Sequence, residues 1–97
     1  MRHEIILAPE AIEDLGRLRA YDRAAVRHAM EQYLRLLPQR VSKTRIKKLR
    51  GLRRPQYRLR VGEIRVFYDV REGRVEVLAI IGKSQADQWL QEEGEME

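Results

Sequence analysis

The chain has 97 residues, of which 43% are hydrophobic and 36% are charged, with a formal net charge of +5. This length predicts a single domain over residues 1–97 with one small core, which excludes large cofactor enzymes with deep clefts. Cysteine is absent and His3 and His28 are the only histidines, so disulfides, thiolate chemistry and cysteine-based metal sites are excluded. We expect no metal and no cofactor.

The hydropathy pattern contains no candidate membrane segment. No stretch approaches the roughly 18–20 apolar residues that a bilayer span requires. The first residues, from Met1 to Ile5, lack the long apolar run of a signal peptide. We therefore expect a cytoplasmic protein without membrane contact, and the positive net charge favours a polyanionic partner.

The first third of the chain predicts a strand followed by two helices. Glu4–Leu7 is a short apolar run, and Pro9 suits the first turn of a helix. In the first helix we expect Ile12, Leu15 and Leu18 to face the core. Asp22 is a candidate N-cap for a second helix that ends at Pro38. The buried stripe of this second helix is predicted to be Val26, Met30, Tyr33 and Leu37.

The last half of the chain predicts three strands and a helix. Residues 56–61, 64–70 and 74–81 read as strands, joined by turns at Gly62-Glu63 and Glu72-Gly73. Ser84 is a candidate cap for a final helix through about Glu92, with Trp89 either anchoring it on the sheet or stacking on a base. The tail after about residue 93 is expected to fray.

These elements define an α+β fold. An N-terminal strand and an antiparallel helical hairpin are followed by a three-stranded antiparallel meander, which completes a twisted sheet, and by a short C-terminal helix.

The charges are distributed unevenly. Between Glu31 and Glu63 the chain has no acidic residue, whereas after Lys83 it has acidic residues and no cation. The basic interval contains the cations Arg35, Arg40, Lys43, Arg45, Lys47, Lys48, Arg50, Arg53, Arg54, Arg58 and Arg60. Unpaired like charges repel one another and destabilise a fold unless an anion is normally present. This interval therefore predicts phosphate binding, although a solvated face is the ordinary alternative.

A two-residue turn at Gly62-Glu63 fixes the register of the strands beside it. Arg60 then faces Arg65 and Arg58 faces Phe67, while Tyr57 pairs with Tyr68 on the core face. The register predicts that Arg58, Arg60 and Arg65 share one face of the sheet. Its floor is expected to contain Phe67, Leu78 and Ile80. The alternative is that the three side chains splay into water or pair with the acidic C-terminal helix.

Such a cluster has a defined chemistry. Arginine binds phosphate oxygens bidentately and stays charged, so several guanidinium groups can stabilise the charge that develops as a 2′-hydroxyl attacks phosphorus. Arginine is a poor general base, so proton transfer requires another group. Lys47, Lys48 and Lys83 are candidates because neighbouring cations lower a lysine pKa. Tyr57 and Tyr68 are weaker candidates, since their parity directs them into the core.

Four segments of the chain form a recognisable set: LAPEAIEDLGRL from Leu7, KKLRGL from Lys47, QYRLRVGEIRVFYDV from Gln56 and VEVLAIIGKS from Val75. They resemble the RelE/ParE superfamily of toxins from type II toxin–antitoxin systems, and the resemblance extends from about Glu4 to Leu90. It implies a helical hairpin on a mainly antiparallel sheet. It also implies a cognate antitoxin that wraps the toxin and masks its basic face.

The resemblance leaves two activities open. Members that resemble RelE cleave mRNA in the ribosomal A site, and they carry basic residues at the positions of Arg58, Arg60 and Arg65. Members that resemble ParE poison DNA gyrase. Two positions depart from the RelE pattern, because Ser84 replaces an arginine and no tyrosine matches the C-terminal catalytic one near Trp89.

We therefore expect a ribosome-dependent endoribonuclease that cleaves mRNA, with Arg58, Arg60, Arg65 and Lys83 as its catalytic residues. The expected RNA-binding residues are Lys43, Arg45, Lys47, Lys48, Arg50, Arg53 and Arg54. The expected partners are the ribosome with its mRNA and an antitoxin, the latter in a hetero-oligomer. The alternative is a ParE-like or degenerate toxin that acts by binding without cleaving RNA.

Overall fold

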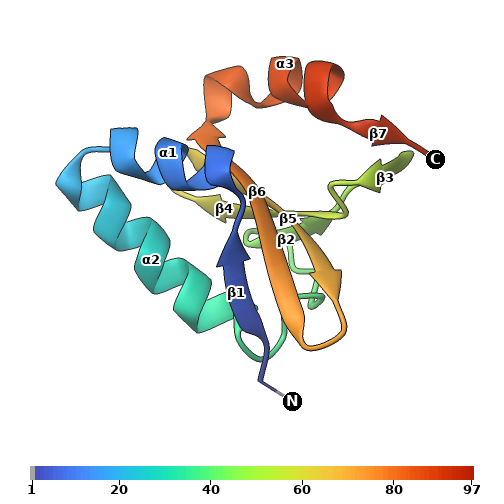
Figure 1. Ribbon diagram of the computed structural model, residues 1–97, viewed down its shortest axis with the longest axis horizontal. Coiled ribbons are helices and arrows are strands. Elements are labelled where there is room, and N and C mark those ends of the chain that lie inside the picture. The colour runs from blue at the N-terminus through green and yellow to red at the C-terminus, as the bar shows by residue number, and fades with distance from the viewer. Residues whose placement is uncertain (1) are drawn as a thin grey trace.

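The computed structural model describes residues 2–97, and within this range the chain forms three helices and seven strands (Figure 1). The elements in chain order are β1 (Glu4–Leu7), α1 (Pro9–Arg17), α2 (Ala20–Leu34), β2 (Ile46–Lys48), β3 (Leu52–Arg54), β4 (Tyr57–Val61), β5 (Ile64–Arg71), β6 (Arg74–Gly82), α3 (Lys83–Glu93) and β7 (Glu95–Met96). The predicted α+β class is confirmed. No helix among the described residues is long and apolar enough to cross a membrane.

The main sheet has the order β1-β6-β5-β4-β2. Strands β4, β5 and β6 form the predicted antiparallel meander, and β1 adds to β6 in parallel. Strand β2, which we did not predict, pairs antiparallel with β4 at the edge. A second sheet consists of β3 and β7. The basic interval thus supplies two short strands, β2 and β3, in addition to the predicted β4, although Lys is depleted in strands.

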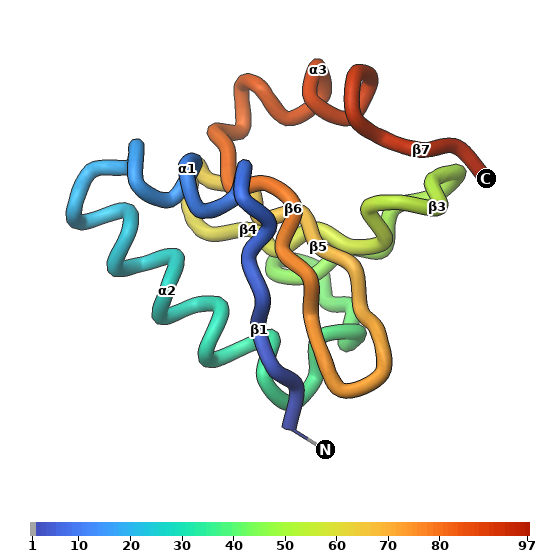
Figure 2. The backbone as a smooth tube through the Cα atoms, viewed as in Figure 1, coloured from blue at the N-terminus to red at the C-terminus, as the bar shows by residue number. Residues whose placement is uncertain are grey.

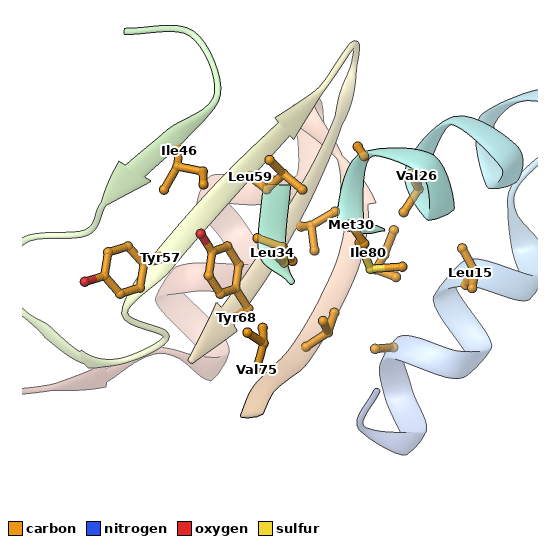
Figure 3. Packing of buried hydrophobic residues seen from close by; sticks show 14 residues of the cluster. Leu15, Val26, Met30, Leu34, Ile46, Tyr57, Leu59, Tyr68, Val75 and Ile80 are labelled. Atoms are coloured by element: carbon orange, nitrogen blue, oxygen red, sulfur yellow. The ribbon is translucent and has the colours of Figure 1, made fainter. Parts of the chain in front are cut away.

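The helical hairpin covers one face of the sheet, and α3 lies apart from it (Figure 1). Beneath the hairpin is the main core, where Leu15, Val26 and Leu34 pack against the inward side chains of the strands (Figure 3). Tyr57 and Tyr68 stack within this core with their ring centroids 5.6 Å apart. The Tyr68 hydroxyl donates a hydrogen bond of 2.6 Å to the Pro38 carbonyl, which satisfies its polar end in the interior.

Several predicted helix positions were wrong. Leu15 is buried as predicted, but Ile12 is 59% exposed, and Ala11 faces the core in its place. Helix α2 ends at Leu34, well before Pro38, so Leu37 lies beyond the helix and is exposed while Leu34 is buried. The N-cap position of α2 is Arg19. The predicted cap, Asp22, therefore lies inside the first turn.

Strand β6 contains a β-bulge that changes the predicted floor of the sheet face carrying Arg58, Arg60 and Arg65, which we call the arginine face. Phe67 pairs with Ala79 and Tyr68 with Val77, so Leu78 is an extra residue. Beyond it the side-chain alternation reverses, which places Ile80 in the main core and Ala79 beside Phe67 on the opposite face. The floor consists of Phe67, Ala79 and Ile81, and the predicted placement of Leu78 and Ile80 was wrong.

The C-terminal part packs on this second face. The side chains of Trp89 and Phe67 stack with centroids 5.0 Å apart, so Trp89 anchors α3 on the sheet. Gly82, rather than Ser84, occupies the N-cap position, and no side chain caps the helix. Residues Glu95–Met96 form β7 on β3, which differs from the frayed tail that we expected.

Candidate nucleic-acid interface

The three predicted arginines lie on the sheet face opposite the helical hairpin. Their neighbours Leu59 and Val66 are buried in the main core, and side chains alternate along a strand. Arg60 of β4 is the register partner of Arg65 on β5. Arg58 pairs with Phe67 on one side and with Lys47 of β2 on the other. The two-residue turn therefore gives the register predicted from the sequence, and β2 adds a fourth cation.

The charges of the three guanidinium groups act on one another. Burial lowers the pKa of Arg58, and the positive charges of Arg65 and Arg60 lower it further. Burial also lowers the pKa of Arg65, as does the charge of Arg60, against an opposing effect of Glu63. The cluster is therefore compact enough for its members to repel one another.

This repulsion is not relieved by ion pairs. Among residues 2–97, no carboxylate lies within 4.0 Å of the guanidinium nitrogens of Arg58, Arg60 or Arg65. The Nε atom of Arg58 is buried and has no hydrogen-bond partner. A buried donor without a partner is costly. The face is thus suited to an anion such as a phosphate, whose negative charge would offset the repulsion among the arginines.

Arg65 differs from the other two arginines in its surroundings. It is only 6% exposed. Its Nη1 donates hydrogen bonds to the carbonyl oxygens of Gly62, at 2.8 Å, and Ile64, at 3.1 Å. Arg65 therefore holds the β4–β5 turn in place. From its buried position it also contributes positive charge to the arginine face. Arg60 is exposed and Arg58 half-buried, so these two are the more accessible to a ligand.

Lys83 lies at the same end of the sheet. Its backbone N–H donates to the Glu63 carbonyl at 2.7 Å, which joins the start of α3 to the β4–β5 turn. Its side chain is exposed. Glu63 was read from the sequence only as a turn residue, yet its charge acts on Arg65. The turn thus carries a carboxylate beside the three arginines. The position of Glu63 next to Gly62 in the sequence indicated a turn but not this electrostatic role.

The predicted RNA-binding residues fall into two groups. Four of them are exposed and have no carboxylate partner among the described residues: Lys43, Lys47, Lys48 and Arg50. Of these four, Lys48 has its Nζ atom over the Tyr57 ring, 5.7 Å from the ring centroid. The other three also make side-chain contacts. Arg45 lies over the Tyr33 ring at 5.3 Å, Arg53 pairs with Glu95 at 2.8 Å and Arg54 pairs with Asp69 at 3.5 Å.

Asp69 is a buried carboxylate that sequence analysis did not single out. It is fully buried, and its Oδ1 accepts a hydrogen bond of 2.8 Å from the backbone N–H of Gln56. Burial raises its pKa, against the lowering effects of that hydrogen bond and of Arg71 and Arg54. Asp69 alternates along β5 in step with Arg65 and Phe67, so it lies on the same face of the strand. Because it is buried and hydrogen-bonded to Gln56, its role is to hold the segment before β4 in place.

Groups for proton transfer are scarce on the arginine face. Tyr57 and Tyr68 are buried in the main core, and burial raises the pKa of Tyr68 far above its ordinary value. Trp89, near the position of the expected catalytic tyrosine, is stacked on Phe67. Among the described residues, no group of three or more His, Asp or Glu side chains is placed to hold a metal.

Comparison with solved structures finds the same architecture in toxin–antitoxin complexes. The RelE–RelB complex from Pyrococcus horikoshii OT3 matches with a TM-score of 0.70 at 20% identity, over 88% of this chain and 99% of that chain. The RelB–RelE complex from Methanococcus jannaschii gives 0.66 at 20% identity, over 87% and 96% of the two chains. The RelBE2 complex from Mycobacterium tuberculosis gives 0.66 at 24% identity, over 84% and 99%.

The fold is therefore that of the RelE toxins. A family model described as the ParE toxin of the type II toxin–antitoxin system parDE matches residues 5–87. The chain belongs to this family, and it is a toxin of the RelE/ParE superfamily. No curated protein matches the chain significantly.

Proposed function

We propose that this toxin binds RNA through the arginine face and cleaves mRNA on the ribosome, as an endoribonuclease of the RelE type. The observation that supports the proposal most is that three mutually repelling arginines share one face without a carboxylate partner among residues 2–97. A phosphodiester would supply the missing negative charge. The same groups would stabilise the additional charge of the transition state.

The residues take different parts in this proposal. Arg58 and Arg60 hold the scissile phosphate, because their side chains are more accessible than that of Arg65. Arg65 contributes its positive charge from beneath the turn. Lys47, opposite Arg58 on β2, guides the RNA backbone onto the face. Lys83, at the start of α3, is the candidate for proton transfer to the leaving oxygen.

The proposal includes an antitoxin as partner. The matched structures from Methanococcus, Pyrococcus and Mycobacterium are complexes of toxin and antitoxin. An antitoxin that covers the arginine face would neutralise its charge as the phosphate does. We propose that such a hetero-oligomer is the inactive form in the cytoplasm.

A second function is supported by a separate observation. The arginine face lacks the tyrosine of the RelE pattern, Ser84 stands in place of an arginine, and Tyr68 is buried with a raised pKa. A toxin with this surface can bind a target such as DNA gyrase without any proton transfer. This ParE-like alternative requires the basic face for binding only.

Mapping of mRNA 5′ ends after expression of the toxin in cells distinguishes the two functions. The proposal predicts new ends inside translated frames, which disappear in an Arg58→Gln/Arg60→Gln variant. A matched control, Arg17→Gln/Arg27→Gln, removes two charges from the helical hairpin and retains the cleavage. Intact messages together with broken DNA would contradict RNA cleavage and support the gyrase alternative.

A further inference from the structure

The acidic segment, residues 92–97, returns to the basic interval in space (Figure 2). Strand β7 pairs antiparallel with β3, with Leu52 opposite Met96 and Arg54 opposite Glu95. The Glu97 amide then donates a hydrogen bond of 3.3 Å to the Gly51 carbonyl. Residues far apart in the sequence are thus joined by backbone contacts at the edge of the predicted RNA-binding surface.

The acidic segment reaches β3 because the chain passes close to the end of α3 at Gly94. Its amide donates to the Leu90 carbonyl at 2.9 Å, at the end of α3. A Cβ atom at this position would overlap that same oxygen and lie 3.3 Å from Cδ2 of Leu52. A side chain at position 94 therefore requires the end of α3 and the acidic segment to move apart, which disturbs the contact with β3.

The contact is also electrostatic. Glu95 Oε1 lies 2.8 Å from Arg53 Nη2. Glu97 lines one surface hollow together with Lys47, Lys48 and Arg50, which are three of the exposed cations predicted to bind RNA. These carboxylates therefore occupy positions where RNA phosphates would lie if the surface binds RNA.

The segment is held weakly enough to be displaced. The Arg53 and Glu95 side chains are 72% and 47% exposed, and exposed ion pairs contribute little to stability. A sheet of two strands is only marginally stable by itself. A polyanion with several phosphates can therefore compete with the two carboxylates for the cations.

We propose that the acidic segment is a built-in competitor for the basic surface from Lys47 to Arg54, and that RNA displaces it on binding. This inference rests on the proposed function, since it takes an RNA backbone as the ligand. The free toxin then binds RNA less tightly than a toxin whose segment is neutralised or released. The arginine face itself remains open in both states.

Two variants test the proposal, and neither changes the arginine face. Glu95→Gln/Glu97→Gln removes the competing charges, and Gly94→Ala displaces the segment at unchanged net charge. The control Glu10→Gln/Glu13→Gln removes two carboxylates from exposed positions of α1. The probe is a fluorescently labelled single-stranded 2′-O-methyl RNA oligonucleotide, which has no free 2′-hydroxyl and so cannot be cleaved by 2′-hydroxyl attack. Its binding to each variant is measured by fluorescence anisotropy at low salt.

We expect both test variants to bind the probe about two- to five-fold more tightly than the wild type, and more tightly than the control. Hydrogen exchange of the Glu97 amide in the wild type should become faster when the probe binds. Equal affinity of the test and control variants, or unchanged Glu97 exchange, would overturn the proposal. Because the probe cannot be cleaved, absence of nuclease activity overturns the proposed function alone and leaves this measurement interpretable.

Discussion

Replacing Arg65 should destabilise the toxin, unlike replacement of its cross-strand partner Arg60. In Arg65→Met, the carbonyl oxygens of Gly62 and Ile64 lose their hydrogen bonds from Nη1. Hydrogen bonds to charged groups contribute about 1.5–3 kcal/mol each. In the variant, water can hydrogen-bond to the carbonyl oxygens of the exposed turn, and the repulsion of Arg65 by Arg58 and Arg60 is removed. Both effects reduce the loss of stability. We expect a net decrease of about 1–3 kcal/mol in the free energy of unfolding.

Arg60→Met is the matched control, because this exposed side chain donates no hydrogen bond within residues 2–97. Its replacement should change stability by no more than about 0.5 kcal/mol. Urea unfolding followed by circular dichroism measures both variants. Equal midpoints would refute the structural role of Arg65. If the difference is found, lost toxicity in an Arg65 variant reports on the fold as well as on RNA binding.

Three further predictions concern the scaffold. Asp14→Ala should lower the free energy of unfolding by about 1–3 kcal/mol, because Asp14 accepts a hydrogen bond from the Ile80 backbone N–H at the bulge in β6. In the same urea titration, replacement of the exposed Glu13 by alanine should change the free energy of unfolding little. Burial raises the pKa of Asp69 above 3.8, so the native state binds this proton more tightly than the unfolded state. The stability of the wild type relative to Asp69→Asn should therefore fall as the pH rises from about 4 to about 7, and a constant difference would contradict this. Trp89→Ala removes the stack on Phe67 and should loosen α3, with faster amide exchange there and a loss of about 2 kcal/mol; unchanged exchange would argue against the anchor.

The β4–β5 hairpin was predictable because its signals are local. Gly62 has a φ of 58°, a conformation that glycine adopts readily, and the two-residue turn fixes every pair along both strands. Alternation then separates Tyr57 and Tyr68 from the arginines. The meeting of Arg60 with Arg65 therefore follows from the sequence alone.

The bulge in β6 was not predictable for a physical reason. Residues 77–81, where the bulge lies, are all apolar, so a shift in alternation leaves no trace in the hydrophobic pattern. The group that stabilises the shift is Asp14, whose Oδ2 accepts the Ile80 amide at 3.0 Å across 66 positions of sequence. Asp14 otherwise reads as an ordinary residue of a surface helix.

The burial of Arg65 and the pairing of the acidic segment also escaped prediction. Arginine is rarely buried, and the carbonyls that hold Arg65 belong to the turn itself. Strands β3 and β7 are too short for a periodic signal. Their contact depends on the absence of a side chain at Gly94, which the sequence alone presents as an ordinary helix end.

The salt dependence of RNA affinity tests the central claim, that the arginine face binds a nucleic-acid backbone. Each phosphate neutralised on a single strand contributes about −0.7 to the slope of log K against log salt concentration. Because Arg58 and Arg60 hold one phosphate in this proposal, the Arg58→Gln/Arg60→Gln variant should have a slope about 0.7 smaller in magnitude than the wild type. The Arg17→Gln/Arg27→Gln variant should keep the wild-type slope. Equal slopes in the two double variants would contradict the assignment of RNA binding to this face.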